Sequence, residues 1–148
     1  MLEVDKIKVV VDTNVVISSA ISVDGNPAKI FKMVLLETIK NYTTTGILEE
    51  IRDVLNRPKI ARRLSLVERN FIINNFGRFS EKIEPNLEFF EIKEDPDDNK
   101  FLECAVSAAV DYIISGDEHL LNVGEFRGIK IVNPADFIRL FDEQTKPD

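Results

Sequence analysis

Four carboxylates in this chain stand where strands and helices can bring them together, and they are its best candidates for chemistry. They are Asp12, Glu50, Asp98 and Asp117. Clustered carboxylates repel one another and raise one another's pKa unless a cation lies among them. The chain has one histidine and one cysteine, which excludes a site built from several of either. We therefore expect these four residues to hold Mg²⁺ or Mn²⁺, hard ions that prefer oxygen and activate water for phosphoryl displacement.

Asp12 stands at the end of a predicted buried strand. Val9–Val11 form an apolar, β-branched run within the segment Lys6–Val16, which is typical of a strand covered on both faces. Thr13 and Asn14 then supply capping chemistry for a helix that begins near residue 15. Ligands of open α/β sheets bind at the carboxyl ends of strands, which favours a functional role for this carboxylate. The simpler alternative is that Asp12 only caps the helix.

Asp98 is singled out by its place on a predicted helix, which opens at Asp95 and runs to about Val110. At 3.6 residues per turn Asp98 projects onto the apolar face, whereas Lys100 and Glu103 are predicted to point to solvent. A carboxylate directed inward needs a partner, because a lone buried charge is costly. The alternative is a capping box, in which Asp98 accepts a hydrogen bond from the backbone N–H of Asp95.

The other two acids have similar alternatives. Glu50 lies at the edge of the apolar stripe of a predicted helix over residues 46–55, from which it can reach a cleft. It can equally be a surface residue paired with a lysine or arginine. Asp117 follows a predicted strand over residues 111–115, and it can instead be the cap of a short helix over 118–122.

Several other polar and aromatic residues are secondary candidates. Asn14 is placed to orient a ligand or to cap a helix, and Ser115 to donate to a carboxylate or a phosphate. Cys104 lies on an apolar face and is expected to pack in the core. His119 is expected to be a surface residue within reach of a substrate. Most of the ten phenylalanines fall at core spacing, so we do not interpret them as platforms for base stacking.

Charge is unevenly distributed along the chain. The net charge of −7 argues against nonspecific binding to nucleic acid by overall charge. The segment from residue 52 to residue 78 is locally positive, and the segment from residue 81 to residue 103 is acidic. We expect either two solvated surfaces or a basic rim beside an acidic site. The candidate rim residues are Arg52, Arg57, Lys59, Arg62 and Arg63.

The order of predicted elements is typical of an α/β protein with a mainly parallel sheet and helices on both faces. Strands are expected at 6–12, 41–45, 111–115 and 129–132, with a short strand or extended link within 83–92. Helices are expected at 15–21, 26–40, 46–55, 59–64, from residue 65 to 77 or 79, and from residue 134 onward. We expect one domain over 1–148 with a disordered tail at 143–148, no membrane segment, and, without a signal sequence, a cytoplasmic location.

The chain resembles the PIN-domain proteins, in particular the VapC-like toxins of prokaryotic toxin–antitoxin pairs. The resemblance spans almost the whole length, through VVVDTNVVISS, ILEEIRDVLNRPK, DPDDNKFLECA and DYIISGDEHLL in that order. It implies a three-layer α/β/α PIN-like fold. It also implies a metal-dependent ribonuclease specific for single strands, commonly a homodimer and often blocked by an antitoxin. Its acidic positions match Asp12, Glu50, Asp98 and Asp117, and its supporting positions match Asn14 and Ser115.

Three functional hypotheses follow. The first is an endoribonuclease in which the four acids hold Mg²⁺ or Mn²⁺ and the basic rim contacts RNA. The second is a phosphatase, because Asp12 in VVVDTNV is similar to the aspartyl nucleophile of haloacid-dehalogenase-type enzymes, although Asn14 stands where those carry a second aspartate. The third is a regulatory module that binds RNA without cleaving it.

Overall fold

Six strands form one sheet in the order β3-β2-β1-β4-β6-β5 in the computed structural model, which describes residues 5–147. All neighbouring strands are parallel except β5 and β6, which are antiparallel. The strands are β1 Lys8–Val11, β2 Lys40–Thr43, β3 Glu81–Lys82, β4 Tyr112–Ile114, β5 Glu125–Phe126 and β6 Ile129–Val132. The helices are α1 Thr13–Ile21, α2 Asn26–Leu35, α3 Thr45–Leu55, α4 Pro58–Ala61, α5 Leu66–Arg78, the 3-10 turn η1 Pro96–Asp98, α6 Asn99–Ala108, α7 Glu118–Val123 and α8 Pro134–Thr145.

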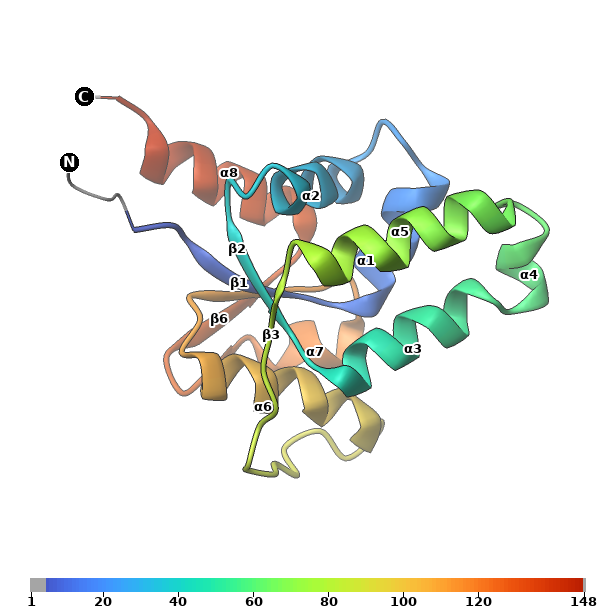
Figure 1. Cartoon of the computed structure of the whole chain (residues 1–148). Coiled ribbons are helices and arrows are strands. Elements are labelled where there is room, and N and C mark those ends of the chain that lie inside the picture. The colour runs from blue at the N-terminus through green and yellow to red at the C-terminus, as the bar shows by residue number, and fades with distance from the viewer. Residues whose placement is uncertain (1–4, 148) are drawn as a thin grey trace.

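Helices cover both faces of the sheet. Helix α6 packs against β1, β2 and β4, and α7 packs against β6. On the opposite face α1, α2, α3, α5 and α8 pack against one another, so that α2 and α8 lie across the sheet from α6 (Figure 1). The sheet between them is apolar, with Val9, Val10, Ile113 and Ile114 fully buried. The predicted three-layer α/β/α architecture is therefore confirmed.

The middle of the sheet is where the chain changes direction. From β1 the chain winds outward through β2 to β3, and it then returns past β1 to form β4 on the other side. Val11 is the register partner of Ile114, so the carboxyl ends of β1 and β4 lie side by side. A crevice forms at such a switch point because the connections leave the two strands in opposite directions, and ligands of open α/β sheets bind there.

Helix ends differ most from the sequence-based expectations. Helix α2 ends at Leu35 rather than Lys40, because Glu37 adopts a left-handed backbone with φ of 55°. The N–H of Thr38 then donates to the carbonyl of Met33, which closes a Schellman motif. Glutamate is an unusual residue at that position, so the sequence carried no stop signal. The predicted start near residue 65 is confirmed, because Ser65 caps α5 and forms a full capping box with Glu68.

Other boundaries also need correction. Of the two alternatives for 83–92, the link is correct and the strand is not, while the two-residue strands β3 and β5 lie outside every predicted strand. The predicted helix from Asp95 begins as a 3-10 turn, and α6 proper runs only from Asn99 to Ala108. The tail expected to be disordered from residue 143 is helical to Thr145, and its Gln144 donates to the hydroxyl of Tyr112. Within residues 5–147, every helix is too short or too polar to span a bilayer.

Candidate active site

Asp12 and Asp117 are joined through one serine at the carboxyl ends of β1 and β4. The hydroxyl of Ser115 donates to Oδ2 of Asp12 at 2.6 Å and accepts a hydrogen bond from the backbone N–H of Asp117 at 2.9 Å. Asp12 is 4% exposed and makes no side-chain cap bond to α1, so the simple capping alternative is wrong for this residue. Asp117 does cap α7, because its Oδ1 accepts from the N–H of His119 at 2.9 Å.

Two asparagines fix the backbone around these carboxylates. Asn14 Oδ1 accepts from the N–H of Gly116 at 3.3 Å, which ties the first turn of α1 to the loop after β4. Asn41 is buried in β2, where its Oδ1 accepts from the N–H of Val11 at 3.0 Å and its amide donates to Ser80. Asn14 thus supports the site by holding the loop after β4. Asn41 was not predicted, because an asparagine in a strand carries no signal of the neighbour that it will meet.

Asp98 enters the cluster from the other side, at the junction of η1 and α6. It is 7% exposed, and its Oδ2 is buried with no hydrogen-bond partner among the described residues. The capping-box alternative is wrong, because Asp95 and Asp98 make no side-chain cap bonds. The prediction that this carboxylate points inward and needs a partner is confirmed. A buried carboxylate oxygen without a donor is costly, and it is a position that a bound cation would satisfy.

Glu50 is reached by an unpredicted lysine. Lys100 lies in the first turn of α6, and its Nζ forms a short ion pair with Glu50 and a second one with Asp97 at 3.0 Å. The prediction that Lys100 points to solvent is therefore wrong, since its side chain is only 18% exposed. Helical projection assigns a direction at the backbone, whereas the long stem of a lysine bends back over apolar surface. The ion-pair alternative for Glu50 is correct, and the pair keeps this glutamate beside the cluster.

The pKa values indicate how closely the acids are coupled. Burial raises the pKa of Asp12 to about 6, the Ser115 hydrogen bond opposes this, and the charge of Asp117 adds to it. Burial also raises the pKa of Asp98 to about 8, with a further contribution from Asp117. The charge of Glu50 raises the pKa of Asp12 as well. The charges of Asp117 and Glu50 thus act on Asp12, and those of Asp117 and Asp12 act on Asp98, as expected of carboxylates gathered in one place.

A trio that the sequence did not predict also forms here. One ligand atom from each of Asp95, Asp98 and His119 lies within 4.8 Å of the other two. His119 was expected at the surface, and its side chain is indeed 43% exposed. It is nevertheless a neighbour of two carboxylates. No sequence signal linked Asp95 to His119, because they are brought together only when α7 and η1 meet at the sheet edge.

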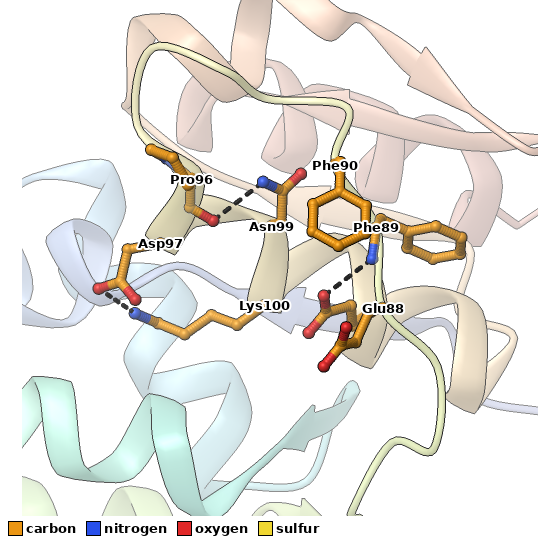
Figure 2. Close-up of a pocket in the computed structure, with 8 residues that line it drawn as sticks. Glu88, Phe89, Phe90, Pro96, Asp97, Asn99 and Lys100 are labelled. Atoms are coloured by element: carbon orange, nitrogen blue, oxygen red, sulfur yellow. Dashed lines mark hydrogen bonds and ion pairs between the residues drawn. The ribbon is translucent and has the colours of Figure 1, made fainter.

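A hollow of about 270 Å³ opens beside this site (Figure 2). Asp97 and Lys100 line it and also belong to the Glu50 ion-pair network, so the hollow borders the acidic cluster. Phe90 stands at its wall with 77% of its surface exposed. The expectation that the phenylalanines serve the core holds for most of them but not for Phe90 or Phe71. The remaining lining residues are Glu88, Phe89, Pro96, Asn99 and Glu103.

The predicted basic rim is exposed and follows α3 away from the sheet. Glu50 lies on α3, and α4 continues from its far end (Figure 1). Within residues 5–147 none of the five rim side chains forms an ion pair with a carboxylate. These are Arg52, Arg57, Lys59, Arg62 and Arg63. Unpaired exposed guanidinium and ammonium groups are available to contact phosphates.

The fold and the acidic cluster are those of a known family. The PIN domain family matches residues 8–119, and the chain belongs to it; PIN domains are generally nucleases. The chain is similar to uncharacterized protein MJ1680 of Methanocaldococcus jannaschii, at 38% identity over 96% of each protein. Its fold is similar to that of PAE2754 from Pyrobaculum aerophilum, with a TM-score of 0.63 and 13% identity over 91% of this chain and 90% of that one.

Proposed function

We propose that this protein is a metal-dependent endoribonuclease that cleaves single-stranded RNA. The observation that carries the proposal is the pair of buried carboxylates at the switch point, of which Asp98 retains an oxygen with no donor. Membership of the PIN domain family supports nuclease chemistry over the phosphatase hypothesis. It does not by itself select RNA, which we infer from the resemblance of the sequence to VapC-like toxins.

In this proposal Asp12, Glu50, Asp98 and Asp117 would hold Mg²⁺ or Mn²⁺. The bound ion would supply activation of water and neutralisation of charge on the phosphate. The oxygen-only set of these four acids fits such hard ions. Ser115 holds the Asp12 carboxylate in place, and it does so without a charge that would compete with the cation. Lys100 offsets the charge of Glu50 and limits repulsion within the cluster.

The RNA chain is proposed to run between the basic rim and the hollow. Arg57 and Lys59 would contact phosphates on the rim side, since exposed cations contribute most of the affinity for a polyanion. On the other side the exposed ring of Phe90 offers a face on which a base can stack. Stacking requires an unpaired base, which supports a preference for single strands.

The test is cleavage of a fluorescent single-stranded RNA by the purified protein. Cleavage is expected with Mn²⁺ or Mg²⁺ and not with EDTA, and it should be lost in Asp12→Asn and Asp98→Asn. Asp142→Asn, an exposed acid on α8, is the matched control and should cleave normally. The matching duplex should be a poor substrate. Cleavage that survives both EDTA and Asp12→Asn would end the proposal.

Two further measurements separate the alternatives. RNA binding that is independent of metal and gives no product would favour the regulatory module. A phospho-aspartate trapped at Asp12 during turnover of a phosphate monoester would favour the phosphatase. Each hypothesis has its own positive signal, so the three measurements together decide among them.

We further propose a toxin role in the cytoplasm, a homodimer, and control by an antitoxin. Leu66, Val67 and Phe71 of α5 are large apolar side chains that stay exposed, and they support association with a protein partner. Light scattering should give the mass of a dimer. Induced expression should arrest growth, and Asp12→Asn should relieve the arrest. A stable monomer whose expression leaves growth unaffected would contradict these proposals.

A further inference from the structure

Three ligand-type side chains meet at the outer edge of the acidic cluster. Asp95 precedes η1, Asp98 ends it, and His119 lies in the first turn of α7. One ligand atom from each lies within 4.8 Å of the other two. Ligand atoms that share one ion through bonds of about 2.1 Å lie about 3 to 4.2 Å apart. A small rotation of the two outer side chains would therefore bring all three onto one ion.

The protein's own hydrogen bonds leave this trio unsatisfied. Asp98 is 7% exposed, and its buried Oδ2 has no partner within residues 5–147. The side chain of Asp95 makes no cap bond to η1. The nearest carboxylate to Nδ1 of His119 is that of Asp117 at 3.9 Å, beyond hydrogen-bond distance. A cation site needs an inward-facing oxygen without a donor, beside two free ligand groups. Ordinary packing would have given that oxygen a hydrogen-bond donor.

We propose that Asp95, Asp98 and His119 form a site for a divalent transition-metal ion at the rim of the acidic cluster. Asp98 is shared between this rim site and the four-acid site. The proposal refines the cofactor of the proposed nuclease, but metal binding at the trio does not depend on RNA cleavage.

The donor set decides which ions the rim site prefers. An imidazole nitrogen is a good ligand for Zn²⁺, Fe²⁺ and Ni²⁺, Mn²⁺ accepts it beside carboxylates, and Mg²⁺, which favours oxygen, binds it poorly. The rim site should therefore discriminate against Mg²⁺, whereas the four-acid site, with oxygen donors alone, should accept both. The single histidine of the chain makes this difference measurable.

The test is electron spin-echo envelope modulation on the full-length protein loaded with Mn²⁺. Because His119 is the only histidine, ¹⁴N modulation of the imidazole type can come from that residue alone. We expect the modulation in the wild type, its loss in His119→Gln, and its retention in Glu118→Gln, the exposed neighbour. Circular dichroism checks that each variant is folded.

Calorimetry supplies a second readout. His119→Gln and Asp95→Asn should each weaken Mn²⁺ binding by at least the roughly 10- to 100-fold that loss of a supporting partner costs. Mg²⁺ binding by the same variants should stay unchanged. Bound Mn²⁺ without imidazole modulation, or absence of Mn²⁺ binding at millimolar concentration, would overturn the rim site. Failure of RNA cleavage with the modulation intact would overturn only the proposed function.

Discussion

The hydroxyl of Ser115 donates to the carboxylate of Asp12 at 2.6 Å, although 103 residues separate the two in the chain. The bond exists because β1 and β4 are neighbours, so that residues just past their carboxyl ends face each other. The hydrogen bond lowers the pKa of the buried Asp12, since a donor to a carboxylate favours its ionised form. Removing this hydrogen bond should therefore change the pH at which Asp12 ionises.

Ser115→Ala should move the acid limb of the cleavage profile to higher pH. Without the donor the pKa of Asp12, already raised to about 6 by burial, rises further, so that the ionised form needs a higher pH. The measurement is the pH dependence of kcat/KM at Mn²⁺ concentrations below saturation, where protons and the ion compete for Asp12. Ser107→Ala, at an exposed serine of α6, is the control and should leave the profile in place. An acid limb that Ser115→Ala leaves unmoved would show that Asp12 does not set it.

Metal-free protein should lose stability as pH rises, which is opposite to an ordinary acid-sensitive domain. Burial raises the pKa of Asp12 to about 6 and that of Asp98 to about 8, both above the ordinary value of 3.8 for an aspartate. The folded state therefore binds protons that the unfolded state has released. The resulting stabilisation is complete below the unfolded pKa and is lost as pH passes 6 and then 8. The melting temperature in EDTA, measured from about pH 5 to about pH 8.5, should fall.

Asp98→Asn should flatten that fall, because the amide has no proton to lose. Mn²⁺ should raise the melting temperature of the wild type more at pH 8 than at pH 5, where protons compete for the carboxylates. Asp142→Asn should behave like the wild type. Equal shifts by Mn²⁺ at both pH values would refute the coupling.

Neutralising the basic rim should weaken RNA binding and its dependence on salt. In the Asp12→Asn background, Arg62→Gln with Arg63→Gln removes two cations, each worth about 0.7 in the slope of log affinity against log salt, or about 1.4 together. Fluorescence anisotropy at several NaCl concentrations gives the slope. Lys29→Gln with Lys32→Gln, on exposed positions of α2, removes the same charge elsewhere. If both pairs change the slope equally, the rim is not the RNA surface.

Asn41→Ala should destabilise the fold and disturb the site together. It leaves the buried N–H of Val11 without an acceptor, which costs about 1–3 kcal/mol, and it frees the backbone just before Asp12. Urea unfolding measures the loss of stability, and Mn²⁺ affinity reports the site. Asn70→Ala, on an exposed face of α5, should change both far less.

The architecture was predictable because strand and helix patterns repeat over many residues. The apolar run of β1 and the inward face of α6 identified Asp12 and Asp98 without any knowledge of contacts. Strand β5 was missed, since two residues carry no period. The end of α2 was missed because its left-handed residue is Glu37 rather than glycine. A two-residue strand and a left-handed glutamate both lack a recognisable pattern in the sequence.

The site was less predictable where it depends on neighbours from distant segments. Lys100 was assigned to solvent because projection considers one helix, whereas its partner Glu50 lies on another. Asp95 was predicted to be a helix cap, and His119 a surface residue within reach of a substrate. The two side chains become neighbours only because η1 and α7 lie close together in the fold, and the spacing of residues in the sequence does not predict that contact.

The position of β4 next to β1 also governs when the site can exist during synthesis. The centre of the sheet stays open until residues 112–114 have left the ribosome, because β1 has no inner neighbour before then. Long-range pairing of this kind forms late, after local helices have already folded. Until residues 115–117 have been made, Asp12 lacks both Ser115 and Asp117, so the site of the proposed nuclease is incomplete in a nascent chain. For an enzyme that would attack RNA, this order of assembly separates manufacture from action.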